Sequence, residues 1–157
     1  MEIISTSKGI GGQLTEFRKL VNNSKKITFI GTAGFCTPFA ELMAFVMRGT
    51  DKEMVFLPNL RSDQARSIIS SSHGMQLGDI ADPAADTIVL LGGLAMPKIG
   101  VEPEKMKGLV DELLKDAEKK MIIGVCFQSM LINQKWPEMI DFDYIIDADL
   151  TNEVKKL

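Results

Sequence analysis

The sequence predicts a three-layer α/β sandwich with a mostly parallel sheet. Short, continuously apolar and β-branched runs recur along the chain, which is typical of strands buried on both faces. Segments of helical period lie between them, and this alternation is typical of parallel strands joined by right-handed crossovers. Because the 157 residues contain no repeat or linker, we expect one domain, residues 1–157, with five or six strands.

Six elements are predicted in the first half of the chain. Apolar residues at helical spacing indicate the helices, and continuous apolar runs indicate the strands. Pro38 fits a first helical turn, Pro58 stops the second strand, and Ala65, Ile68 and Ile69 share one helical face. In order, we expect a helix over 14–21, a strand over 25–31, a helix over 37–48, a strand over 54–57, a helix over 63–71 and a short strand over 75–77.

Five elements are predicted in the second half. The longest helix is indicated by one apolar stripe, formed by Met106, Leu109, Val110, Leu113, Leu114 and Ala117. In order, we expect a strand over 87–91, a helix over 103–119, a strand over 121–125, a short helical stretch ending at 134 and a strand over 142–146.

The composition excludes several classes of protein. With 18 basic and 21 acidic side chains and a pI near 5.2, the chain has no surplus of cations for nucleic-acid phosphates, so no nucleic-acid partner is expected. The longest apolar runs are far shorter than the ~20 residues of a membrane span. The first residues lack the pattern of a signal peptide. We therefore expect a cytoplasmic protein without a membrane partner.

The chain has two cysteines and one histidine, and this limits its chemistry. Neither cysteine has the spacing of a metal site or of a disulfide framework, so no metal is predicted. Any nucleophilic mechanism that needs an imidazole base has to use His73.

Ligands of parallel α/β sheets bind beyond the carboxyl ends of the strands, here the loops 31–38, 92–97 and 125–129. In the third loop, Cys126 stands between an apolar run and a helical start, the position of a nucleophile in a strand–turn–helix elbow. A helix N-terminus at that point lowers a thiol pKa and stabilises an oxyanion. Alternatively Cys126 is a small core residue, because free cysteine is among the most buried residue types.

The runs DTIVLLGG (86–93) and KKMIIGVCFQSMLI (119–132), with the helix between them, resemble the core of the class I glutamine amidotransferase-like superfamily, particularly its intracellular-protease and parkinsonism-protein branch. This resemblance implies an amidotransferase-like or flavodoxin-like, Rossmann-like fold. The whole chain also resembles a small uncharacterised protein family of methanogenic archaea, and that resemblance implies no activity.

The superfamily resemblance implies roles for four residues. Cys126 is the elbow nucleophile, the backbone N–H groups of Gly93 and Phe127 form the oxyanion hole, and Glu41 is the acidic partner. Enzymes of that superfamily take their histidine from downstream of the cysteine, whereas His73 lies upstream, so amidotransferase chemistry is not expected. A thiol of lowered pKa without a base remains open to redox or adduct chemistry.

The loop GTAGFCTP, which follows the first strand, has features of an anion cradle. Its glycines let backbone N–H groups point at an anion, and the dipole of the next helix favours negative charge. The alternative is ordinary turn chemistry. The chain lacks the dinucleotide fingerprint and a phosphate-binding GK[ST] loop, so no cofactor is predicted. The candidate anion- or ligand-binding residues are Gly31, Thr32, Gly34, Cys36, Thr37 and Gly92.

If the strands over 25–31 and 121–125 are neighbours, Cys36 and Cys126 approach each other and can form a thiol pair or a disulfide. Three functions are left open. The first is a thiol-dependent small-molecule enzyme or redox protein centred on Cys126. The second is a noncatalytic domain that binds a nucleotide or another small anion. The third is an oligomerisation or interaction module, for which the partner can be a second copy in a homodimer.

Overall fold

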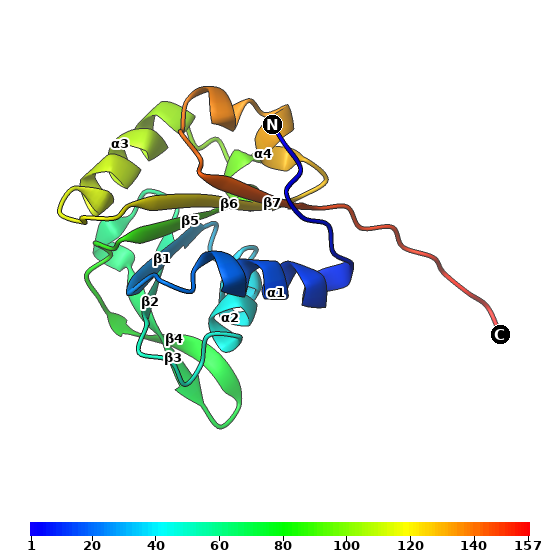
Figure 1. Ribbon diagram of the computed structural model, residues 1–157, viewed down its shortest axis with the longest axis horizontal. Coiled ribbons are helices and arrows are strands. Elements are labelled where there is room, and N and C mark those ends of the chain that lie inside the picture. The colour runs from blue at the N-terminus through cyan, green and yellow to red at the C-terminus, as the bar shows by residue number, and fades with distance from the viewer.

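A seven-stranded sheet with the order β4-β3-β2-β1-β5-β6-β7 forms the centre of the protein, and helices lie on both of its faces (Figure 1). The computed structural model describes residues 1–157. The strands are β1 (Lys26–Gly31), β2 (Glu53–Pro58), β3 (Arg66–Ser71), β4 (Gly74–Ile80), β5 (Thr87–Leu91), β6 (Met121–Phe127) and β7 (Tyr144–Ala148). The helices are α1 (Gly9–Leu20), α2 (Thr37–Phe45), α3 (Pro103–Leu114) and α4 (Met130–Asn133), with short 3₁₀ turns over 62–64, 92–95 and 136–138.

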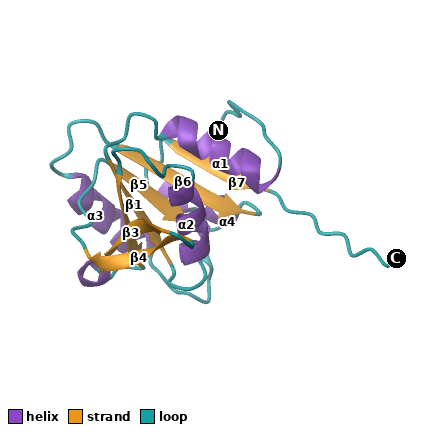
Figure 2. Ribbon diagram, turned by 90° about the horizontal axis from the view of Figure 1, so that it is seen from below, coloured by secondary structure: helices purple, strands orange, loops and turns teal.

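The two faces of the sheet are covered by different helices. Figure 2 shows α1 and α2 lying across one face, where Phe17 and Met43 join the apolar side chains of the strands. On the other face, Met106 of α3 and Leu131 of α4 belong to a second core. Successive strand residues alternate between these cores because a strand has a side-chain period of two. The predicted α/β class with a mostly parallel sheet is confirmed, with seven strands rather than five or six.

The chain changes direction across the sheet between β1 and β5. From β1 it passes through α2 to β2 on one side, and after β4 it returns to β5 on the other side of β1. Both neighbours run parallel to β1. The loops that follow β1 and β5 therefore diverge in opposite directions and leave a crevice between them, the usual ligand position in open α/β sheets.

The predicted helix over 63–71 is wrong, because Arg66–Ser71 forms β3. This strand pairs antiparallel with both β2 and β4. Its sequence, RSIISS, places β-branched residues among serines, which are weak helix formers, and two neighbouring strands supply its backbone hydrogen bonds. Gly74, with φ +107°, closes the hairpin to β4. The short strand expected over 75–77 is part of this longer β4.

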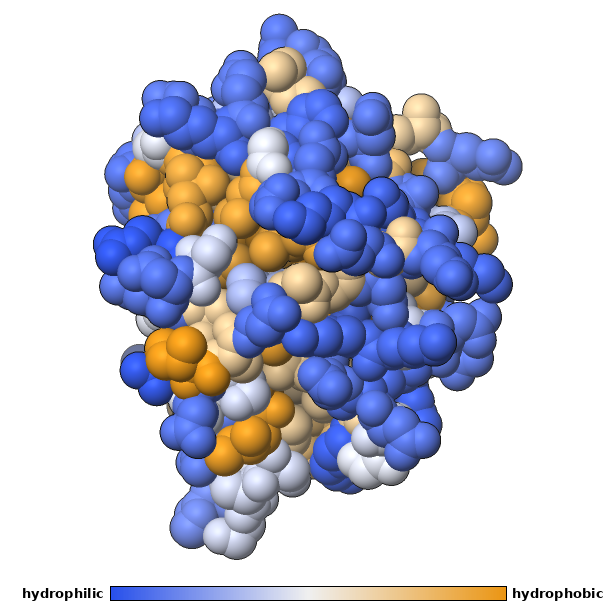
Figure 3. Space-filling view, turned by 90° about the vertical axis from the view of Figure 1, so that its left-hand side faces the viewer, coloured by the Kyte–Doolittle hydropathy of each residue, from blue (hydrophilic) through white to orange (hydrophobic).

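Other differences concern where elements end. The helix α3 ends at Leu114 instead of 119, and α2 ends at Phe45 instead of 48. The strand β6 continues to Phe127, two residues beyond the expected end, and β7 lies two residues later than expected. None of the helices is long and apolar enough to span a membrane. Figure 3 shows that hydrophilic side chains cover most of the side at the left of Figure 1, with apolar groups gathered in separate patches.

Candidate functional site

A cavity of about 290 Å³ opens at the carboxyl ends of β1, β5 and β6, beside the point where the chain changes direction. All three loops that the sequence singled out contribute to its wall. The lining residues are Phe35, Cys36, Phe39, Leu91, Gly92, Gly93, Met96, Val125, Phe127, Gln128 and Met130. The wall contains no charged side chain, and Gln128 provides its only side-chain amide.

Three glycines allow the loops to approach each other this closely. A Cβ atom on Gly92 would lie 2.5 Å from the Cβ of Cys126, and one on Gly93 would lie 2.5 Å from the sulfur of Cys36. A Cβ on Gly31 would lie 2.5 Å from the Cβ of Cys36. None of these glycines has a positive φ. They are therefore required by close packing and not by backbone conformation.

Aromatic rings form much of the cavity wall. The centroids of the Phe39 and Phe127 rings are 5.0 Å apart, and the planes are tilted by 54°. This arrangement is favourable between rings. Phe35 lies at the rim and is 59% exposed, which is unusual for a phenylalanine side chain in a folded protein. Met96 and Met130, which are flexible and polarisable, complete an apolar surface that can adapt to a ligand.

The cysteine that faces the cavity is Cys36. Burial raises the pKa of its thiol, although the backbone N–H groups of Thr32 and Gly93 and the Thr32 hydroxyl act in the opposite direction. The thiol is therefore protonated at neutral pH. The N–H of Gly93, which the superfamily resemblance assigned to an oxyanion hole at Cys126, is directed at the sulfur of Cys36 instead.

Cys126 lies on the other face of the sheet, in the core beneath α3 and α4, and only 1% of it is exposed. Its thiol donates a hydrogen bond to Oδ1 of Asp147 at 3.4 Å. Burial raises the pKa of Cys126 to about 12. The backbone N–H groups of Met130 and Leu131, at the start of α4, act to lower this pKa, and the nearby carboxylate of Asp147 acts to raise it. These surroundings stabilise the neutral thiol, which is a poor nucleophile.

The local backbone also differs from a nucleophile elbow. Cys126 is an ordinary residue of β6 and does not stand in the turn. The left-handed residues are Gln128 and Ser129, with φ values of 52° and 56°. The carboxylate of Asp147 accepts hydrogen bonds from the N–H of Ser129 at 2.8 Å and from its hydroxyl at 2.7 Å, and so holds this turn.

The structure does not bring the predicted catalytic residues together. Glu41 is half-buried on α2, which covers the face of the sheet opposite to Cys126. Gly93 and Phe127 line the cavity, whereas Cys126 does not. His73 is exposed in the hairpin between β3 and β4, with Nδ1 3.0 Å from the Ser72 hydroxyl. Since β3 runs antiparallel to β2, this hairpin lies toward the opposite end of the sheet.

The loop that was expected to cradle an anion uses several of its own donors. The N–H of Gly34 donates to the Thr37 hydroxyl at 3.0 Å, and the N–H of Cys36 donates to the carbonyl of Thr32 at 2.8 Å. The Thr32 hydroxyl donates to Asn59 at 3.2 Å. Pro38 has no N–H. Gly31 is buried against Cys36, and Gly92 lines the cavity.

The two cysteines do not form the disulfide that was considered. The neighbours of β1 are β2 and β5, so β5 separates β1 from β6. In addition, Cys36 belongs to the core under α1 and α2, and Cys126 to the core on the opposite face. No group of three or more His, Cys, Asp and Glu side chains is placed to hold a metal ion.

Sequence reasoning missed several residues of this region. Phe39, Met96 and Met130 line the cavity but read as ordinary core residues of helices and loops. Asp147 was not considered because the strand that carries it was expected to end one residue earlier. The position of two of these residues in the chain could have indicated that they line the site. Phe39 lies in the first turn of the helix after β1, and Met96 follows the glycine pair after β5.

Comparisons with known proteins agree with each other. A family model described as "Uncharacterized protein conserved in archaea (DUF2124)" matches residues 8–151. An uncharacterised protein of Methanothermobacter thermautotrophicus is 39% identical over 154 residues, 98% of each chain. The uncharacterised protein MJ1183 of Methanocaldococcus jannaschii is 40% identical over 151 residues, which cover 94% of this chain and 90% of that protein.

A solved structure is similar as well. The crystal structure of a protein of unknown function from Methanothermobacter thermautotrophicus superposes with a TM-score of 0.91 at 37% identity, covering 99% of this chain and 98% of that one. The similarity in sequence and in fold thus extends over nearly the whole length. The chain belongs to the archaeal family DUF2124.

Proposed function

We propose that this protein is a noncatalytic small-molecule-binding domain, whose cavity at the carboxyl ends of β1, β5 and β6 takes an uncharged aromatic group. The observation that carries the proposal is the apolar cavity of about 290 Å³ at the crevice between β1 and β5. This is the position at which open α/β sheets bind ligands. The superfamily resemblance of the segments around Gly93 and Cys126 supports the same location, but not the same chemistry.

The size of the cavity fits a small ring system. An apolar cavity of about 150 Å³ holds a benzene molecule, so about 290 Å³ suffices for two fused rings. The tilted pair Phe39 and Phe127 offers ring faces and edges to such a ligand. Phe35 at the rim can cover it.

The chemistry of the wall favours reversible binding over catalysis. Both thiols are held in their neutral form by burial, and the single histidine lies in a remote hairpin. No lysine or arginine lines the cavity to pair with an anion. These features favour an aromatic group over the small anion that the loop sequence suggested, and over thiol-dependent chemistry.

The test is a titration of the ¹⁵N-labelled protein with indole, 2-naphthol and adenosine, followed by two-dimensional NMR. At least one probe is expected to shift the amide signals of Phe35, Gly92 and Gly93 in a saturable manner. Met96→Trp fills the cavity and is expected to abolish those shifts. Leu42→Trp is the matched control, because Leu42 is a partly exposed residue of α2 that does not line the cavity.

Two outcomes would count against the proposal. In the first, none of the three probes shifts these amides while the protein remains folded. In the second, a probe binds equally well to wild type and to Met96→Trp, which would place its binding site elsewhere.

A further inference from the structure

The outer edge of β7 has no neighbouring strand, because β7 pairs only with β6. On the β6 side, the carbonyl of Ala148 accepts the N–H of Gln128 at 2.9 Å. The main-chain groups of successive strand residues point to alternate edges, so those of Ile145 and Asp147 point away from β6. An open edge of this kind can pair with a further strand.

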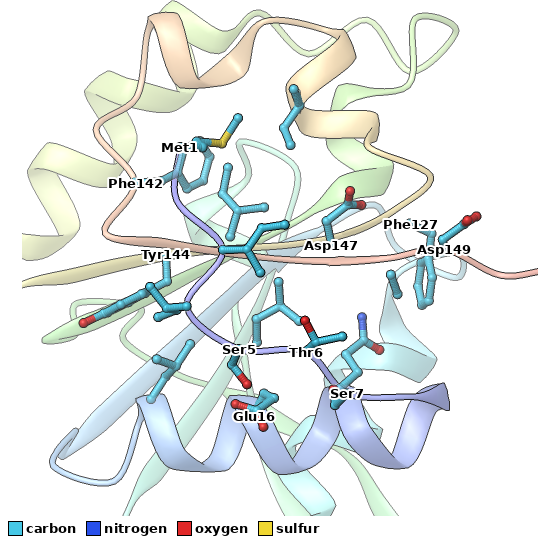
Figure 4. Close-up of a pocket in the computed structure, with 18 of the residues that line it drawn as sticks. Met1, Ser5, Thr6, Ser7, Glu16, Phe127, Phe142, Tyr144, Asp147 and Asp149 are labelled. Carbon is cyan, nitrogen blue, oxygen red and sulfur yellow. The ribbon is translucent and has the colours of Figure 1, made fainter.

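Residues 1–7 border this edge without pairing with it. They cross β7 on their way to α1 and do not run along it, as Figure 4 shows. None of them forms a backbone hydrogen bond with β7. The crossing segment, α1 and residues 140–150 line most of a groove of about 1000 Å³. The fold therefore leaves space for a ligand beside the open edge.

Gln13 of α1 lines this groove and carries a buried donor without a partner. The residue is only 5% exposed, and its Nε2 forms no hydrogen bond. Nearly all buried polar groups of native proteins have a hydrogen-bond partner, and an unpaired one destabilises the fold. A ligand with a carbonyl group would give this amide the acceptor that it lacks.

The groove is also strongly acidic. Among its 26 lining residues there is no lysine, arginine or histidine, so the α-amino group of Met1 is the only cation against six carboxylates. Three of these carboxylates already have a partner, because Glu16 pairs with a lysine, and Asp143 and Asp147 accept backbone N–H groups. The other three are exposed and form no ion pair or hydrogen bond: Glu2, Asp141 and Asp149. They favour a ligand with positive charge.

The two faces of β7 differ in character. Ile146 packs toward the core under α1, where Ile10 and Leu20 also line the groove. Ile145 packs toward the opposite core, and Asp147 shares that face because the side chains of a strand alternate. A strand that pairs with this edge and alternates lysine with apolar residues therefore places its lysines beside the carboxylate and its apolar side chains beside α1.

We propose that this groove binds an extended segment of another protein, in which lysine or arginine alternates with apolar residues, and that the segment adds to the sheet beside β7. Its main chain pairs with Ile145 and Asp147, and one of its carbonyl groups accepts the Nε2–H of Gln13. Its cationic side chains face Asp141 and Asp149, which precede and follow β7 in the chain. Because the five residues of β7 span about 17 Å, a segment of five or six residues is long enough.

The occupant is expected to come from a different protein. The two runs of this chain that combine a lysine pair with β-branched residues are KKITFIG (25–31) and KKMIIGV (119–125). Both already belong to the sheet, as β1 and β6. A second copy therefore has no such segment free to donate. This inference does not depend on the aromatic cavity.

The experiment measures the binding of a fluorescein-labelled peptide by fluorescence anisotropy. The peptide has six residues, lysine and isoleucine in alternation, and blocked ends. It is expected to bind saturably to the full chain. Two altered peptides are expected to bind at least about tenfold more weakly: one with glutamate in place of each lysine, and one with every backbone nitrogen methylated, which cannot donate to β7.

Variants of the protein test the same contacts from the other side. Asp141→Lys with Asp149→Lys is expected to raise the dissociation constant of the peptide at least about tenfold. The control is Glu104→Lys with Glu118→Lys, the same charge change on exposed residues of α3 and the turn after it, outside the groove. Gln13→Met is expected to raise the constant about three- to tenfold. It should not lower the Tm of the free protein, because it removes an unpaired buried donor.

Two-dimensional NMR of the ¹⁵N-labelled protein locates the peptide, with circular dichroism to confirm that each variant folds. The amide signals of Ile145 and Asp147 are expected to shift, and that of Phe35, in the aromatic cavity, is not. Failure of the lysine peptide to bind, or equal binding of the methylated peptide, would overturn the proposal. So would n-hexylamine binding as tightly as the peptide, which would make this a site for small cations. A wild-type dimer that Asp141→Lys with Asp149→Lys dissociates would instead make a second copy the occupant.

Discussion

The backbone of Gly93 lies so close to the sulfur of Cys36 that even a methyl group does not fit. In Gly93→Ala, the new Cβ atom would be 2.5 Å from that sulfur and 3.0 Å from Cδ1 of Phe35. Forcing an extra carbon into a packed core costs about 1–3 kcal/mol. For a chain of 157 residues, 1 kcal/mol corresponds to about 2–4 °C in Tm, so Gly93→Ala is expected to lower Tm by about 2–12 °C.

A second substitution separates this mechanism from a general intolerance of the loop. Cys36→Ala removes the sulfur, so it should relieve most of the cost of Gly93→Ala, leaving the contact with Phe35, an exposed ring that can move. Gly31→Ala is the matched control. Its new Cβ would meet the Cβ of Cys36 at 2.5 Å, an atom that Cys36→Ala retains. Cys36→Ala should therefore restore much more of the stability that Gly93→Ala loses than of the stability that Gly31→Ala loses.

The measurement is urea unfolding of wild type, the three single variants and the two double variants. The double-mutant cycle of Gly93→Ala with Cys36→Ala should show a coupling free energy of about 0.5–3 kcal/mol that favours the double variant. If the costs of the two substitutions simply add, the sulfur is not the obstacle, and the account of the glycine pair given above is refuted.

Two further predictions concern the residues around the β6 turn. Since burial raises the pKa of Cys126 from 9.0 to about 12, the folded state binds its proton more tightly than the unfolded state. The stability that this difference in pKa contributes is complete below pH 9 and is lost as the pH rises toward 12. The Cys36→Ala variant retains Cys126, whereas Cys126→Ala does not. The midpoint of urea unfolding should therefore fall less steeply between pH 9 and pH 12 in Cys126→Ala than in Cys36→Ala. Asp147→Asn weakens the acceptor of two hydrogen bonds from Ser129, and should lower the free energy of unfolding by about 1–2 kcal/mol, whereas Asp149→Asn should leave it nearly unchanged. Equal effects of the two aspartate substitutions in thermal unfolding would contradict this role of the carboxylate.

The sequence alone was sufficient for the centre of the sheet. The runs that became β1, β5 and β6 are continuous, apolar and β-branched, and only a strand buried on both faces suits them. The loops after these strands could be named in advance, because in a parallel sheet all carboxyl ends meet on one side. The helix α3 could be predicted equally well from its stripe of apolar residues. All of these are local patterns, and the strand patterns were enough to predict a site at the carboxyl ends of the parallel strands.

The outer part of the sheet depended on contacts that no local pattern records. In β3, Ile68 and Ile69 fit a helical face as well as a strand, and the choice was made by hydrogen bonds from β2 and β4. Intrinsic preference is a weak guide when long-range pairing supplies the backbone partners. A groove beside the open edge of β7 could not be predicted either, because its wall is formed by residues from two segments far apart in the sequence, 1–20 and 127–150.

The roles of the two cysteines were decided only by the tertiary structure. An all-apolar strand such as β6 has no polar residue to show which side chains face which layer, and a shift of one residue exchanges the two faces. Placed one position from Val125, Cys126 enters the core under α3 and α4, away from the cavity. Cys36, which the sequence had suggested as a ligand-binding residue of the first loop, is the thiol in its wall. The sequence determined that a thiol stands near the carboxyl ends of the strands. The register of β6 in the sheet, which turns Val125 toward the cavity and Cys126 toward the opposite core, decided which thiol a ligand can meet.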